Sequence, residues 1–147
     1  MIYFKIFHPY FKHFYTNLVY MGNRYNVCSM GHRLYNLKKL EEISQGDEVF
    51  VRDMVAEFVH NVTGSIENIL SFKPLEKWTS IAETAHKLVS NFAYLGADML
   101  QALAADIEKS VLSDADLTGI DVKTEKMCND GLLLINQLKE RFGIIDG

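Results

Sequence analysis

Apolar side chains recur at alternating spacings of three and four residues along most of the chain, and this pattern predicts helices. The clearest case is the stretch over residues 78–95. Its apolar positions form a single stripe made of Trp78, Ile81, Ala85, Leu88, Phe92 and Leu95. Such a stripe is typical of a helix that packs one side against the core of a helical bundle.

Two helices are predicted before this stretch. A short amphipathic helix over residues 37–44 ends at Gly46, because glycine is the usual residue just after a helix. Asp47 then suits the N-cap of a long helix that continues to about residue 71. The expected buried stripe of the long helix is Val51, Met54 or Val55, Phe58, Val62, Ile66 and Ile69.

Two more helices are predicted after it. Pro74 suits the first turn of the helix that carries this stripe, which is expected to run to about Tyr94, and Gly96 supplies the turn that follows. The next helix covers about residues 97–112, and after a polar loop Asp121 is expected to cap the last one. The inward positions of these two helices are expected to be Leu100, Leu103, Ile107 and Val111, then Met127, Leu134, Leu138 and Phe142.

The fold class follows from these elements. The chain of 147 residues contains only two prolines, which favours helices over a turn-rich β fold. Four long helices joined by short loops predict an all-α, antiparallel up-and-down four-helix bundle, here with the short additional helix at its N-terminal side.

Charge divides the chain unevenly. The first 40 residues contain six basic residues and no acidic one, whereas the remainder carries all 19 acidic residues and nine basic ones. Residues 1–33 are also rich in phenylalanine and tyrosine. We therefore expect an atypical basic and aromatic N-terminal extension over residues 1–33, followed by the bundle over residues 34–147.

Three interpretations of residues 1–33 remain open. The segment is an upstream extension with the functional start at Met21 or Met30, a basic aromatic arm that contacts a membrane or a partner, or an extra helix of the bundle. Polar residues interrupt it well before the ~20 apolar residues that a membrane span requires. It also lacks the layout of a signal peptide, so a cytoplasmic location is expected.

The cysteines and most histidines point to no metal or redox site. Cys28 and Cys128 lie a hundred positions apart and form neither a disulfide framework nor a zinc signature. His60 has no second ligand at the spacing that a helix would need. We therefore expect two reduced thiols, no metal site and no cofactor.

His86 is the main candidate for chemistry. It lies one residue away from the apolar stripe, and its neighbours one helical turn away include Ala82, Val89 and Ser90, with Ala93 a further turn along. The ring is expected to be exposed on a small and nearly uncharged face. Reversible chemistry on a histidine needs such an imidazole, which a partner can approach closely.

From about Leu34 to Phe142 the chain resembles the histidine-containing phosphotransfer (HPt) domain of multistep phosphorelays. The resemblance rests on Ala85-His86-Lys87-Leu88 within a bundle helix that ends at Leu95-Gly96. A second similarity is the pair Gly46-Asp47, which opens a helix containing Phe50 and Phe58.

The resemblance implies that His86 is the phosphoacceptor, which takes a phosphoryl group from a receiver-domain aspartate and passes it to another receiver. Lys87 and Ser90 would be neighbours of the phosphoryl site, and Ala82, Val89 and Ala93 would dock the partner. Mg²⁺ is expected on the receiver. The chain itself would be a phosphoryl carrier and not an enzyme, because it has no glycine-rich phosphate loop of its own.

Two adjacent positions depart from the family pattern. HPt domains commonly have a lysine three residues after the histidine and a glycine four residues after it, where this chain has Val89 and Ser90. Valine in place of lysine at position 89 removes a cation that would face the phosphoryl group. The alternative function is therefore a non-phosphorylated bundle of HPt type that binds and regulates a kinase or receiver.

The remaining expectations concern partners. The receiver would belong to a hybrid histidine kinase or to a response regulator. Nucleic acid is not expected as a partner, because the bundle is acidic. The chain is expected to be a monomer, and membrane contact would involve only the N-terminal segment.

Overall fold

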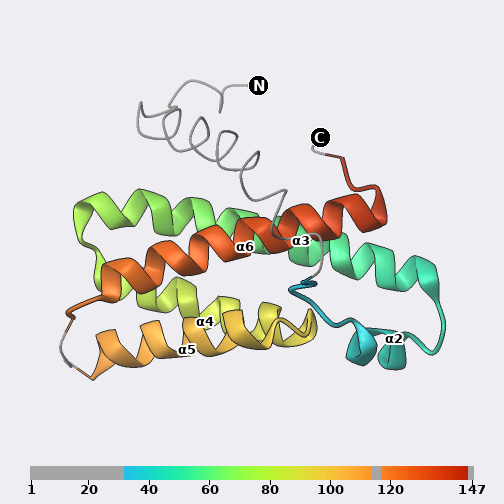
Figure 1. Cartoon of the computed structure of the whole chain (residues 1–147), viewed down its shortest axis with the longest axis horizontal. Helices are drawn as coiled ribbons and strands as arrows, with labels where there is room; N and C mark the ends of the chain where they lie inside the picture. Colours follow the sequence, from blue (N-terminus) through green and yellow to red (C-terminus); the bar gives the residue numbers. More distant parts are fainter. Residues whose placement is uncertain (1–31, 114–116, 146–147) are drawn as a thin grey trace. The chain divides into compact units, whose positions relative to one another are not determined.

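The computed structural model describes residues 32–113 and 117–145, and these residues contain helices and no strand (Figure 1). The prediction of an all-α fold is therefore confirmed. The helices are α2 (Lys38–Ser44), α3 (Glu48–Phe72), the 3₁₀ turn η1 (Lys73–Leu75), α4 (Trp78–Tyr94), α5 (Asp98–Leu112) and α6 (Ile120–Phe142). The predicted extension over residues 1–33 lies outside the described residues, except for its last two positions.

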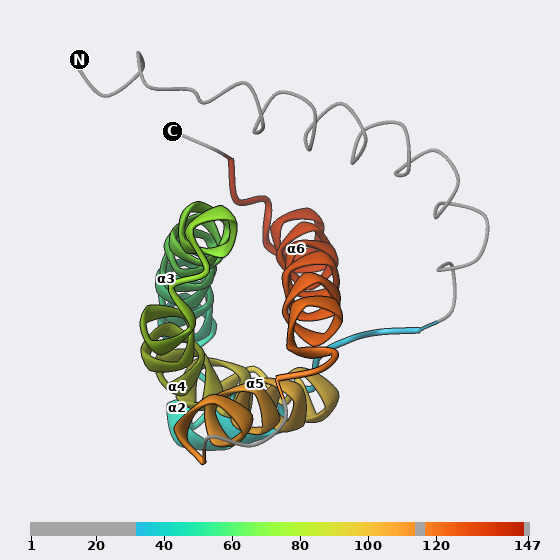
Figure 2. The same cartoon turned by 90° about the vertical axis from the view of Figure 1, so that its left-hand side faces the viewer.

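The four long helices enclose one apolar core. Helix α4 packs against α3 and α5, and α6 packs against the same two helices from the other side (Figure 2). Among the residues described, no helix combines the length and the apolar content that crossing a membrane requires.

Helix α2 and the start of α3 form as the sequence predicts. Helix α2 ends where Gln45 and Gly46 take positive φ angles of 52° and 89°. Asp47 then caps α3, because its Oδ1 accepts a hydrogen bond of 3.0 Å from the backbone N–H of Phe50. This cap satisfies one of the backbone donors that every helix leaves free at its first turn.

The predicted stripes are largely confirmed, with a few shifts. In α3 the buried residue is Val55 and not Met54, and Val59 is buried as well. In α5, Leu100 and Ile107 are buried as expected, whereas Leu103 and Val111 are only partly buried and Ala104 completes the core. Trp78 and Phe142, at the ends of their helices, are also only partly buried.

Two predictions about helix starts are wrong. Pro74 belongs to η1, which continues directly from α3, and α4 begins only at Trp78. Asp121 does not cap α6, because the N-cap is Gly119 and Asp121 lies in the first turn of the helix. There the Asp121 carboxylate forms an ion pair with Lys73 at 3.2 Å, which connects the start of α6 to η1.

The turn between α4 and α5 is held by the segment that precedes α2. Gly96 has φ 61°, and a Cβ atom added to it would lie 2.1 Å from the backbone oxygen of Asn36. In the same place the N–H of Asn36 donates a hydrogen bond of 2.9 Å to the oxygen of Leu95. Glycine is therefore required at position 96 for both its φ angle and the close approach of a second backbone.

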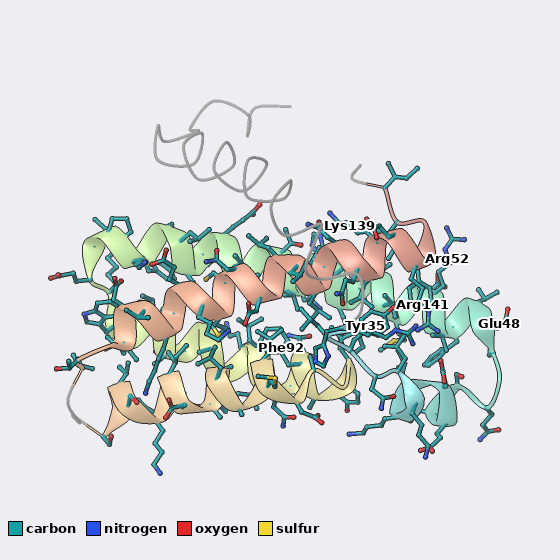
Figure 3. All side chains as sticks on the ribbon, viewed as in Figure 1. Tyr35, Glu48, Arg52, Phe92, Lys139 and Arg141 are labelled. Carbon is teal, nitrogen blue, oxygen red and sulfur yellow. The ribbon has the colours of Figure 1, made fainter. Side chains whose placement is uncertain are left out.

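The same segment is anchored at Tyr35, which is 7% exposed. The guanidinium carbons of Arg33 and Arg141 lie 5.5 Å and 5.6 Å from the centre of the Tyr35 ring. Figure 3 shows Arg141 beside Tyr35. Contacts of this kind between cations and aromatic rings are favourable. The segment before α2 thus joins α6 to the turn that follows α4.

Candidate functional site

His86 lies in the middle of α4 with its side chain 71% exposed. The residue before it, Ala85, is fully buried. The predicted exposure of the ring is confirmed, because position 86 falls just outside the stripe that packs into the core. A helix fixed along its inner side gives the ring a defined position on the surface.

Glu108 of α5 contacts the ring. Its Oε1 lies 2.9 Å from His86 Nδ1, which is hydrogen-bonding distance. The Glu108 side chain is 25% exposed, so the carboxylate is held close to the bundle surface. An ionised carboxylate can only accept hydrogen bonds, and therefore Nδ1 carries the proton in this contact. In the neutral ring Nε2 is then the nitrogen with a free lone pair.

The sequence analysis missed Glu108, although a signal for it exists. His86 follows the buried Ala85, and Glu108 follows the buried Ile107, so each lies one position past the core stripe of its own helix. The chain reverses tightly around Gly96, which brings these two offset positions together. The expectation of a nearly uncharged face is therefore wrong.

A second carboxylate lies on α4 itself. Glu83 is exposed and is three residues before His86, a spacing that brings side chains together on a helix surface. Lys87 is also exposed, but it follows His86 directly and so points about 100° away around the helix. The immediate surroundings of the ring are thus more anionic than cationic.

The residues expected to dock a partner differ in their exposure to solvent. Ser90 is exposed, and Val89 and Ala93 are partly buried, so these three can contribute to a surface beside His86. Ala82 is 1% exposed. Including Ala82 in a docking surface was wrong, because this position faces inward with Ile81 and Ala85.

Two contacts fix α4 against its neighbours near the end of the helix. The rings of Phe58 and Tyr94 stack with their centres 5.5 Å apart, and Lys39 Nζ lies 5.0 Å from the centre of the Tyr94 ring. Phe92, fully buried, points into the bundle between the helices (Figure 3). The helix that carries His86 is therefore held by both its buried side and its C-terminal end.

The other residues considered for chemistry form no reactive or metal-binding site among the described residues. Cys128 is a free thiol in the core, and burial raises its pKa to about 12, so the reactive thiolate is not formed at neutral pH. No group of three or more potential metal ligands occurs in the part of the chain that the structure describes. His60 is exposed on α3 and takes no part in the contact between His86 and Glu108.

Comparison with known families identifies a match for most of the bundle. A family model of the Hpt domain matches residues 53–140, which is more than half of the chain. The matched region includes all of α4 and α5, and therefore both His86 and Glu108. Neither the search of curated proteins nor the search of solved structures gave a match.

Proposed function

Because this chain belongs to the Hpt domain family, we propose that it is a histidine phosphotransfer protein of a multistep phosphorelay. In this proposal His86 accepts a phosphoryl group from a receiver-domain aspartate and passes it to another receiver. The observation that carries the proposal is the geometry of the ring. His86 is 71% exposed, and its Nδ1 is engaged by Glu108 at 2.9 Å, which leaves Nε2 as the nucleophile.

The transfer needs little from the bundle besides a positioned nucleophile. The lone pair of Nε2 attacks phosphorus, the bond between phosphorus and the aspartyl oxygen breaks, and the aspartate leaves as a carboxylate. The ring keeps its Nδ1 proton, so no base is required. Transfer to the next receiver is the same reaction in reverse, and Mg²⁺ is supplied by the receiver domain.

The surface around His86 suits a close approach by such a partner. Ser90 and Ala93 are small, and Val89 is partly buried, so none of these side chains should block the approach of a partner to the ring. The Ser90 hydroxyl is a hydrogen-bond donor one turn after His86, within the surface that the partner would cover. We assign Val89, Ser90 and Ala93 to docking, and Lys87 to the rim of that surface.

The wider proposal follows the expectations from the sequence. In this proposal the chain forms an antiparallel up-and-down four-helix bundle and acts as a monomer in the cytoplasm. It carries the phosphoryl group without a nucleotide site, a metal or a cofactor of its own. Its partner is the receiver of a hybrid histidine kinase or of a response regulator.

The test is transfer from a phosphorylated receiver, or from a hybrid histidine kinase, to the full chain. We expect label that is labile in acid and stable in alkali, and no label in a His86→Gln variant. His60→Gln is the matched control, because it removes another exposed histidine of the bundle and should leave uptake unchanged. Label that persists in His86→Gln would assign the phosphoacceptor to another residue.

A second function is favoured by one position. Val89 stands where the family commonly has a lysine, and this favours a bundle that binds and regulates a kinase or receiver without being phosphorylated. The two functions differ in one measurement. Binding of a receiver with no uptake of label would select the regulatory function, whereas uptake at His86 would select the relay.

A further inference from the structure

Glu108 touches the atom of the ring whose protonation decides how easily a phosphoryl group leaves. We propose that Glu108 keeps the Nδ1 proton on the phosphorylated His86 ring and so holds the phosphoryl group in its readily transferred form. This inference rests on the proposed function, since it requires that His86 takes up the phosphoryl group. It assigns Glu108 as a positioning residue for the release of the phosphoryl group.

The chemistry follows from the two protonation states of the product. When Nε2 bonds to phosphorus and Nδ1 keeps its proton, the ring is a phosphoimidazolium, and its leaving group in the next transfer is neutral imidazole. If Nδ1 loses its proton, the leaving group becomes an imidazolate anion, which departs far more slowly. With the proton retained, the phosphorus–nitrogen bond breaks and the phosphorus–oxygen bond to the next aspartate forms without any exchange of protons with water.

The contact with Glu108 stabilises the protonated product. An opposite charge at hydrogen-bonding distance favours the charged form of a titratable ring. Glu108 lies 2.9 Å from Nδ1 and is three-quarters shielded from solvent, so water weakens the attraction less than it would between two exposed side chains. Within the described residues, His86 is the one partner with which the Glu108 carboxylate makes a hydrogen bond or ion pair.

The other charged groups around the ring do not reverse this effect. On α4, Glu83 adds a second negative charge one turn before His86, and the exposed Lys87 is directed around the helix. On α5, the exposed Lys109 follows Glu108 and is likewise directed around its helix. Helix α3 also packs against α4, and its middle carries the titratable residues Glu57, His60 and Glu67. Among the described residues, none of these three makes a hydrogen bond or ion pair with His86.

The absence of the usual lysine acts in the same direction. A cation three residues after the histidine would attract the phosphoryl oxygens and would stabilise the phosphorylated state. Val89 provides no such attraction, while Glu108 favours the form that gives the phosphoryl group away. The chain would therefore act as a fast transit carrier and not as a store of phosphoryl groups.

The test compares the lifetime of phosphorylated His86 over a range of pH in three chains. The full-length wild type, Glu108→Gln and Glu83→Gln are each phosphorylated with phosphoramidate, a small-molecule donor that needs no partner protein. Glutamine at position 108 keeps the size and a hydrogen-bond acceptor but removes the charge. Glu83→Gln removes the same charge from a neighbouring position that makes no hydrogen bond to the ring.

We expect Glu108→Gln to lower, by about one pH unit, the pH at which the phosphoryl lifetime lengthens. Over the intermediate pH range its phosphoryl group should survive about tenfold longer than in the wild type. Glu83→Gln should move the profile by less than half as much. Nitrogen-15 NMR of the phosphorylated ring should show a proton on Nδ1 in the wild type at a pH where the Glu108→Gln ring has lost it.

Each other outcome has a defined meaning. Identical profiles for wild type and Glu108→Gln, or equal shifts in both variants, would overturn the role of the contact. A folded Glu108→Gln chain that takes up no label would show that the carboxylate is needed for loading and would also overturn it. Glu108→Asp keeps the charge, so its pH profile of phosphoryl lifetime should lie closer to that of the wild type than the profile of Glu108→Gln does. The aspartate variant replaces the glutamine variant in the comparison if the latter does not fold. Failure of the wild type to take up label at His86 would instead contradict the proposed function.

Discussion

On its inner face, α4 places Ala85, Leu88 and Phe92 completely inside the core, whereas His86, one position away from that face, is 71% exposed. The inner residues make close apolar contacts with several helices. Among the described residues, the side chain of His86 makes one polar contact, to Glu108 Oε1. The inner face therefore supports the fold, whereas the proposed chemistry lies on the outer face. Substitutions on each face test this separation.

Phe92→Ala should have the largest effect on stability. Removing a fully buried aromatic ring leaves a cavity, and such changes typically cost about 3–5 kcal/mol of unfolding free energy. Denaturant unfolding followed by circular dichroism measures this loss. Tyr94→Ala is the control on the same helix, where the ring is 40% exposed, and should cost less than half as much. Equal losses would show that the inner face is not the principal source of stability.

Gly96→Ala should have the next largest effect. The new Cβ would meet the Asn36 oxygen at 2.1 Å and would impose a positive φ on alanine, so we expect a loss of about 1–3 kcal/mol. Gly143→Ala separates the two causes, because Gly143 has the same φ of 61° but open space around it. The Gly143 variant should lose less unfolding free energy. If it loses as much, the close approach of Asn36 does not matter.

Val89→Lys tests the outer face at moderate cost. Val89 is only partly buried, and a lysine stem can cover the same apolar surface, so a loss of no more than about 1 kcal/mol is expected. The added cation should attract the phosphoryl oxygens and lengthen the life of phosphorylated His86 several-fold. The phosphoryl lifetime after phosphoramidate treatment is the measurement. An unchanged lifetime would mean that position 89 does not face the phosphoryl group.

His86→Gln should have the smallest effect on folding. An exposed side chain with a single polar contact contributes little, and we expect a change of less than ~0.5 kcal/mol in the same unfolding experiment. This variant should nevertheless lose all uptake of label. A large loss of stability would show that the ring is a structural residue and would remove the separation between the two faces.

Much of this arrangement could be predicted because helical periodicity and caps are local. The stripe from Ile81 to Leu95, the N-cap Asp47 and the turn at Gly96 all follow from neighbours in sequence. The errors at Pro74 and Asp121 concern helix starts, where a residue suited to a first turn can also lie in a neighbouring turn.

The parts that could not be predicted depend on contacts between distant residues. Glu108 is 22 residues from His86, and only the packing of α5 on α4 brings the two together. Ala82 was misplaced for a related reason, because the width of the buried stripe depends on how closely the neighbouring helices approach. The sequence thus singled out His86, the proposed phosphoacceptor, but not the carboxylate that contacts its ring.

The central claim is that Nε2 of His86 carries the phosphoryl group on a face that stability does not need. Phosphorus-31 and nitrogen-15 NMR of the full chain after phosphoramidate treatment tests this claim most directly. We predict one phosphorus–nitrogen signal, assigned to Nε2 of His86 and absent from a folded His86→Gln chain. A signal assigned to Nδ1, a signal that survives in His86→Gln, or no signal in the wild type would contradict it.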